Sequence, residues 1–234
     1  MSMLKAVIYL KPTLIIAKLF FTTDISIVRV RLEAKMNSKF FTTKNVALLG
    51  ILTALVIVLQ LFASAIPMFG VTLNFSLLPI ALAGILLGWA GGAFVGFVCG
   101  VVVFITMAVL GQEPSTAYFF QTDPVILTVM CIGKTTVAGT VSGLLNKFIS
   151  KYNSQIAVGV SSIIIPIINT SIYMLGIVLM KESASQFLGL DSSSAGLVFA
   201  VVFGLIWLNF LLEMVINIIF APLIYRVLNA INKR

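Results

Sequence analysis

Charged residues are scarce in this sequence: they make up 9% of its 234 residues, whereas hydrophobic residues make up 60%. Soluble domains are about 25% charged and about half apolar. Between Lys44 and Glu113 the chain carries no charged residue, and about 20 apolar residues are enough to cross a bilayer. That interval has room for several spans, so the composition excludes an ordinary soluble domain and indicates an all-α integral membrane protein.

Histidine is absent and cysteine is rare. Without histidine the chain lacks the most common general base and metal ligand, which argues against a histidine-dependent membrane hydrolase. The two cysteines, Cys99 and Cys131, lie inside apolar runs, so we predict buried thiols rather than a disulfide or a metal site. No nucleophile constellation is recognisable either. We therefore expect no enzymatic activity, no metal and no other cofactor.

Positive charge is concentrated near the start of the chain. The net charge is +8, but eight of the fifteen basic residues precede Val46. In a membrane protein such a bias sets the topology or contacts anionic lipid. We therefore expect the lipid bilayer, and not nucleic acid, as the partner of these charges.

The first 44 residues differ from the rest of the chain. Their apolar runs are broken by Lys11, Pro12 and Lys18, and they form neither a membrane span nor a secretory signal. Met36 opens the segment MNSKFFTTKN, which is typical of a short cytoplasmic lead into a first span. Our hypothesis is that translation begins at Met36. Residues 1–35 are then an atypical extension, and residues 36–234 form the membrane domain.

Charge-poor runs predict a bundle of six transmembrane helices. The second run is short, about 22 Å of helix against a hydrocarbon core of about 30 Å, and the glycines that follow it favour a tight turn into the third. The expected spans are residues 46–66, 75–89, 91–111, 124–145, 156–180 and 197–225.

The flanking charges predict the orientation. Lys39, Lys147 and Arg226 share one side, which the positive-inside rule makes cytoplasmic, and an even number of spans places both termini there. The chain is thus expected to be a multi-pass protein of a bacterial plasma membrane. The three outward loops, residues 67–74, 112–123 and 181–196, are predicted to be long and irregular, as ligand-binding loops often are.

Two charged residues lie within predicted spans, Lys134 in the fourth and Glu213 in the sixth. A charge at mid-membrane costs about 2.5 to 3.5 kcal/mol on insertion scales, so both side chains are expected to face the bundle interior. One interpretation is that Lys134 binds a substrate carboxylate and that Glu213 positions Lys134, a hydroxyl or an amide. The alternative is a buried structural salt bridge.

Uncharged polar residues surround these charges. Asn209 and Asn217 lie four residues on either side of Glu213, on one face of the helix. Asn169 and Tyr173 follow Pro166, whose ring interrupts the hydrogen-bond ladder of the fifth span. These residues and Asn74 predict a polar cavity, although interhelical asparagines also hold membrane helices together.

Small residues at four-residue spacing mark close helix approach. Gly50 and Ala54 form such a pair in the first span. The pair serves either packing within the protein or docking to a partner membrane subunit.

Several segments, in this order, resemble the substrate-binding S component of energy-coupling factor (ECF) vitamin transporters. The resemblance covers residues 36–234 and includes six short-looped spans and the pair Gly50 and Ala54. Its motifs are NFSLLPIALAGILLGWAGGAFVGFVCG from Asn74, GKTTVAGTVSGLL from Gly133, PIINTSIYMLG from Pro166 and NFLLEMVINIIFAPLI from Asn209.

The resemblance implies a vitamin-binding subunit without its own ATPase. Such a subunit associates through its first helices, here Gly50 and Ala54, with a transmembrane coupling subunit and two ATPases. The implied substrate-binding residues come from the first two outward loops and helices four to six. They are Asn74 with residues 69–73 before it, Tyr118 to Gln121, Lys134, Asn169, Tyr173, Asn209, Glu213 and Asn217.

Among vitamins, the motifs most resemble the pantothenate branch. Pantothenate has a carboxylate, an amide and two hydroxyls, which suits one lysine and several asparagines. Riboflavin or another vitamin stays open, because Tyr118, Phe119 and Phe120 would suit a flat ring. A rival interpretation is an autonomous proton-coupled secondary carrier, with Glu213 or Asp123 as the relay.

Overall fold

The computed structural model describes residues 42–64, 74–190 and 195–232. The chain divides into two compact units, Met1–Val46 and Ala47–Arg234, and the second unit contains the features described below. The predicted extension, residues 1–35, lies outside the described residues, as do residues 65–73 of the first outward loop.

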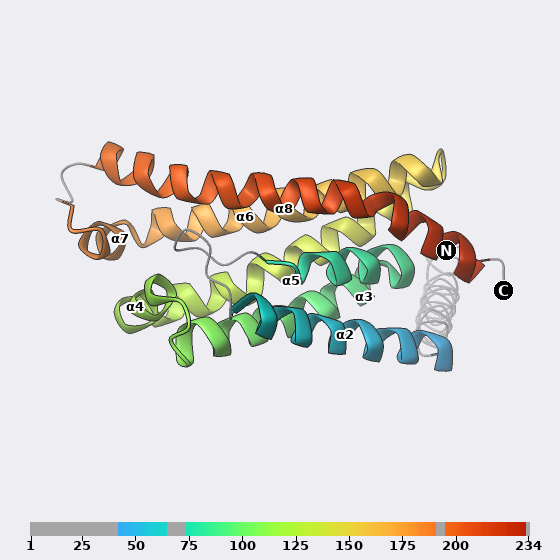
Figure 1. Cartoon of the computed structure of the whole chain (residues 1–234), viewed down its shortest axis with the longest axis horizontal. Coiled ribbons are helices and arrows are strands. Elements are labelled where there is room, and N and C mark those ends of the chain that lie inside the picture. Colours follow the sequence, from blue (N-terminus) through green and yellow to red (C-terminus); the bar gives the residue numbers. More distant parts are fainter. Residues whose placement is uncertain (1–41, 65–73, 191–194, 233–234) are drawn as a thin grey trace, which may run out of the picture. The chain divides into compact units, whose positions relative to one another are not determined.

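Every regular element in the described ranges is a helix (Figure 1), in agreement with the all-α prediction. Five of the helical stretches are long and apolar enough to cross a membrane. The elements are α2 (Thr43–Ser64), α3 (Leu77–Val103) with the π-helical turn η1 (Phe104–Val109), α4 (Pro114–Thr122), α5 (Pro124–Ile149), α6 (Ser154–Leu179), α7 (Lys181–Phe187) and α8 (Ala195–Asn232).

The predicted count of six spans is not confirmed, because the second and third merge into one helical stretch of 33 residues, Leu77–Val109. Within that stretch Gly88 has φ 75° and ψ −171°, a conformation that favours glycine. The α3 ribbon doubles back on itself (Figure 1), and a Cβ atom built on Gly92 would lie 3.0 Å from the Cα of Gly84. The predicted turn is therefore present inside this stretch.

Two of the outward segments are helical where irregular loops were predicted. Helix α4 occupies most of residues 112–123, and α7 begins the segment 181–196. Pro114 starts α4 at a position where a helix has no use for a backbone N–H. The Ser183 hydroxyl of α7 donates a hydrogen bond to the carboxylate of Asp123 between α4 and α5. A proline start and a hydrogen bond between distant segments thus accompany helices that are too short to span a membrane.

Glycine allows the second arm of α3 to pack closely against α5. A Cβ atom on Gly92 would lie 2.2 Å from the carbonyl oxygen of Gly139, and one on Gly96 would lie 2.3 Å from that of Thr135. The Thr135 hydroxyl donates to the Gly96 carbonyl oxygen at 2.7 Å. Such backbone proximity is the usual way for membrane helices to gain packing energy where no hydrophobic drive exists between them.

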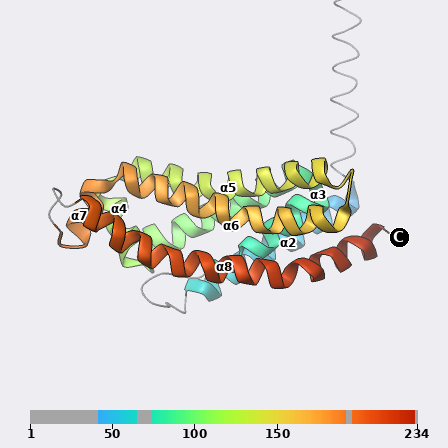
Figure 2. The same ribbon diagram turned by 90° about the horizontal axis from the view of Figure 1, so that it is seen from above.

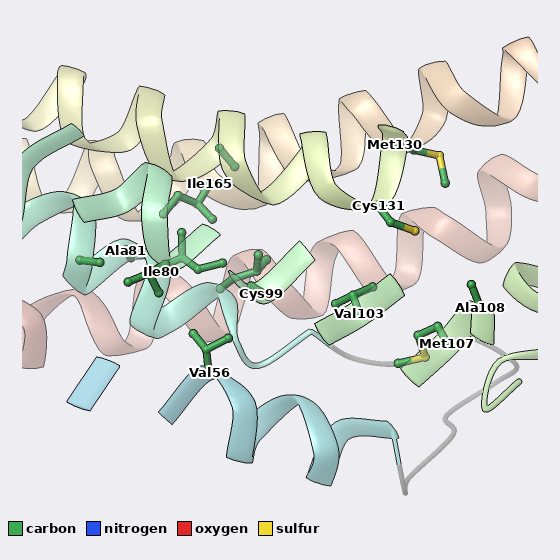
Figure 3. Close-up of a cluster of buried hydrophobic side chains, with 14 of the residues drawn as sticks. Val56, Ile80, Ala81, Cys99, Val103, Met107, Ala108, Met130, Cys131 and Ile165 are labelled. Atoms are coloured by element: carbon green, nitrogen blue, oxygen red, sulfur yellow. The ribbon is translucent and has the colours of Figure 1, made fainter. Parts of the chain in front are cut away.

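The other helices complete the bundle around this pair. Helix α6 packs against α5 on one side and α8 on the other (Figure 2). The apolar core draws on α2, both arms of α3, α5 and α6, as Val56, Ile80, Val103 and Ile165 show in Figure 3. Cys99 and Cys131 are free and buried, as predicted.

The close contact of α3 and α5 makes Gly96 sensitive to one added methyl group. Gly96→Ala should lower stability by about 1 to 3 kcal/mol, the usual cost of overpacking a filled interface. Gly159→Ala is the matched control, because a Cβ atom at Gly159 meets nothing within 4 Å. Thermal unfolding in detergent measures both variants, and equal melting temperatures would contradict the close approach.

Candidate functional site

A small polar cavity, with a volume of about 60 Å³, lies within the bundle. Six of the nine predicted binding residues line it: Asn74, Lys134, Asn169, Tyr173, Asn209 and Glu213. The other lining residues are Gln60, Val103, Met107, Glu113, Thr116, Cys131, Thr170 and Ile206. The cavity wall therefore includes residues of α2, α3, α5, α6 and α8 that are far apart in the sequence.

Lys134 projects from α5 toward α6. Its Nζ atom lies 4.8 Å from the centroid of the Tyr173 ring, within the range of a cation–π contact. Among the described residues no ion pair within 4 Å joins Lys134 to Glu213. The structural salt bridge that the sequence left as an alternative is therefore not formed, and the ammonium group is available to an anion in the cavity.

Glu213 is anchored through only one of its two carboxylate oxygens. Oε1 accepts hydrogen bonds from the Asn209 side-chain amide and from the Asn74 backbone N–H, both at 3.2 Å. Oε2 is buried and has no hydrogen-bond partner. An unpaired buried carboxylate oxygen is costly, so this atom is prepared to accept a hydrogen bond from a ligand.

Asn169 supplies a second unpartnered acceptor from α6. The residue is 5% exposed, and its Oδ1 atom is buried without a hydrogen-bond partner. It lies one turn beyond Pro166, which sits inside α6 as the sequence indicated. A ligand that donates to Asn169 and Glu213 and presents an anion to Lys134 would satisfy three groups at once.

Three predicted binding residues do not line the cavity. The Tyr118 hydroxyl donates to Gln186 of α7 at 3.2 Å, and its ring contacts those of Phe119 and Phe187. Gln121 is exposed on α4. Asn217 is buried, but its side-chain amide donates to the Glu213 backbone carbonyl at 2.8 Å.

The predicted docking pair occupies a different surface. Gly50 and Ala54 are both exposed on α2, and a Cβ atom on Gly50 would meet nothing within 4 Å. The pair does not pack against the rest of the described unit, which leaves its face open to another membrane subunit.

Sequence reasoning missed Gln60 and Glu113 as lining residues. Gln60 is the lone strongly polar side chain in the apolar stretch 46–63 of α2, near the end of the helix, and that isolation was a usable signal. Glu113 was assigned only to the outer side, yet its carboxylate reaches the cavity and accepts from Thr116 at 2.9 Å and from Ser115 at 3.3 Å. The lining therefore has two carboxylates against the one ammonium group of Lys134, so a ligand must bring hydrogen-bond donors as well as an anion.

The sequence matches a family model over residues 44–225, and that model describes the substrate-specific component of ECF transporters. The chain belongs to this family. It is therefore a multi-pass membrane subunit of a transporter, not an enzyme, and the resemblance found in the sequence is confirmed.

A curated relative is the pantothenic acid transporter PanT of Lactococcus lactis subsp. cremoris (strain MG1363), which is 36% identical over 88 residues. That alignment covers 36% of this chain and 44% of the relative, so it spans less than half the length of either.

The two native thiols test whether the cavity is open to water. Cys131 lines the cavity, whereas Cys99 is fully buried beside Ser76 and does not line it. A small charged methanethiosulfonate reagent should therefore modify Cys131 several-fold faster than Cys99. Peptide mass spectrometry after timed labelling measures both rates, and equal rates would show that the cavity is not a route for water-soluble molecules.

Proposed function

We propose that this chain is the pantothenate-capturing subunit of an ECF-type uptake transporter. The observation that carries the proposal is a cavity with one ammonium group and two unpartnered buried acceptors inside an apolar bundle. Lys134 would bind the pantothenate carboxylate. The amide N–H and the hydroxyls would donate to Glu213 Oε2 and Asn169 Oδ1. The partial relative named for pantothenic acid supports the same substrate.

The lining favours a flexible polar acid over a flat ring system. Tyr173 is the one aromatic residue among the described residues that line the cavity, and the ammonium group of Lys134 lies over its ring. Tyr118 and Phe119 contact Phe187, and Phe120 contacts Phe104, so these rings pack against protein neighbours in tilted or edge-to-face geometry. A riboflavin site would need such faces turned toward the ligand.

The proposal also covers the topology. The turn at Gly88 would make the two arms of Leu77–Val109 separate crossings, which gives six spans. Lys147, Lys151 and Arg226 would then lie on the cytoplasmic side with both termini, whereas Glu113 would lie at the outer mouth of the cavity. Pantothenate would thus enter from outside the cell.

Energy for uptake would come from partner subunits. The open face of α2 with Gly50 and Ala54 would dock to a transmembrane coupling subunit driven by two ATPases. On this proposal Tyr118, Gln121 and Asn217 are not primary ligand contacts in the described cavity, and residues 69–73 stay predicted contacts that lie outside the described residues.

A ligand screen tests the substrate. Isothermal titration of the purified protein with pantothenate, riboflavin, folate, biotin and thiamine should show tight binding of pantothenate alone. If riboflavin binds tightly and titration with pantothenate releases no heat, the substrate is riboflavin and not pantothenate.

Lys134→Met should weaken pantothenate binding by about 2 kcal/mol, or roughly 30-fold, because a charge-assisted bond to the carboxylate is lost. Lys147→Met is the matched control, since Lys147 is exposed in the last turn of the same helix. Isothermal titration with pantothenate measures the affinity of both variants. Unchanged affinity in a normally expressed Lys134→Met protein would remove Lys134 from the site.

The coupling is tested by reconstitution. A subunit of this kind, alone in liposomes, should bind pantothenate without accumulating it in response to a pH gradient, and in cells it should copurify with a coupling subunit and ATPases. Uptake by the isolated chain driven by the pH gradient would favour the secondary carrier instead.

A further inference from the structure

Glu113 lies where helix α4 begins, at one end of the bundle. It precedes Pro114, the first residue of α4, and its backbone is extended, with φ −116° and ψ 112°. Helices α4 and α7 contact each other at this end (Figures 1 and 2). The Glu113 side chain is partly buried and lines the cavity together with Thr116 of α4. An acidic side chain thus reaches the cavity from a segment outside the long helices.

Two hydroxyl groups hold the Glu113 carboxylate in this position. The Thr116 hydroxyl donates to Oε2 at 2.9 Å, and the Ser115 hydroxyl donates to Oε1 at 3.3 Å. Thr116 is 4% exposed, so the shorter of the two bonds is shielded from water. A carboxylate has about four acceptor sites, two on each oxygen. These two bonds use one site of each oxygen, which leaves capacity for a donor from a ligand.

The charges around the cavity are unevenly distributed. Among the described residues that line it, Lys134 is the single cation, whereas Glu113 and Glu213 are acidic. The Lys134 ammonium group lies over the Tyr173 ring, where it can meet one anionic group of a ligand. A second anionic group has no other cation among those residues, and Glu113 offers it only lone pairs. Like charges brought together in a binding site are strongly unfavourable, and such repulsion is one way to reject a wrong ligand.

We propose that Glu113 is a specificity-determining residue that accepts a ligand hydroxyl and rejects a phosphate ester of that hydroxyl. A hydroxyl group has a proton to donate to the carboxylate, whereas a phosphate monoester carries a charge of about −1.5 to −2 at neutral pH and presents acceptor oxygens. The ligand class is therefore a monoanion with free hydroxyl groups, whose carboxylate binds Lys134. The inference rests on the proposed function, since it takes pantothenate, with one carboxylate and two hydroxyls, as the ligand.

Isothermal titration of the full chain with two ligands tests the discrimination. The probes are pantothenate and its phosphate monoester at the primary hydroxyl. The parent protein should bind the monoester about 100-fold more weakly or worse, because a like-charge contact and the loss of a hydroxyl donor act together. Equal or tighter binding of the monoester would overturn the inference and leave the proposed function standing. A parent protein that binds neither compound contradicts the proposed function, and the inference fails with it.

Glu113→Gln separates charge from size, because it removes the charge and keeps the shape of the side chain. It should weaken pantothenate binding roughly three- to tenfold, since a neutral amide oxygen is the weaker acceptor, and strengthen binding of the monoester roughly tenfold. A folding defect would weaken both ligands, so only opposite changes support the inference. Glu182→Gln is the matched control and should change neither affinity, because Glu182 is exposed in the first turn of α7 and does not line the cavity.

Glu113→Asp is the second variant, because an acidic residue at the start of a helix also stabilises the helix through its dipole. Thermal unfolding in detergent shows whether Glu113→Gln is folded. Aspartate keeps the charge before α4, so Glu113→Asp should still bind pantothenate more tightly than the monoester. Equal binding of both compounds by Glu113→Asp, or an unchanged monoester affinity in folded Glu113→Gln, would overturn the inference.

Discussion

The carboxylate of Glu213 is the constraint around which the binding region is organised. A charge within an apolar bundle is tolerated only where polar groups meet it. Here the Asn74 backbone and the Asn209 side chain both donate to Oε1, so one carboxylate holds the start of the α3 region against α8. Its second oxygen is left for a ligand. The carboxylate that joins the α3 region to α8 therefore also has one oxygen without a hydrogen-bond partner, and a substrate can donate to it.

The close contact of α3 and α5 determines where the opposite charge lies. Thr135 is fully buried, and its hydroxyl bonds to the Gly96 backbone. Adjacent residues of an α-helix project about 100° apart, so fixing Thr135 against α3 turns Lys134 toward α6. The ammonium group lies over Tyr173 as a result. The glycines of α3 thus act on the site at a distance, through the rotation that they impose on α5.

Much of this arrangement follows from the free-energy cost of placing charged groups in an apolar bundle. The sequence shows which residues carry that cost. Lys134 and Glu213 had to face the interior, and Asn209 had to share a face with Glu213 because of helical periodicity. Asn217 obeys the same periodicity but donates to the Glu213 backbone within its own helix, a local competition that spacing alone does not show. Tyr118 and Gln121 lie outside the described cavity for another reason: α4 folds into a helix on which the Tyr118 ring contacts α7 and Gln121 is exposed.

Gln60 and Glu113 show what sequence patterns leave out. Gln60 is buried on the same face of α2 as Leu52 and Val56, and it meets Ser76 only because the folded bundle brings the two residues together. Glu113 reaches the cavity because α4 begins immediately after it. Both residues act through tertiary contacts between separate elements, and helical periodicity does not predict such contacts.

On the proposed function, the two faces of α2 place binding and assembly on one helix. This chain would bind the substrate while partner subunits supply the energy. The buried residues of α2 are Leu52, Val56 and Gln60, and Gln60 lines the cavity. The exposed pair Gly50 and Ala54 lies on the opposite side of the helix. Leu49 also packs against the core and the Thr53 hydroxyl oxygen is buried, so contacts along much of its length hold α2 to the bundle.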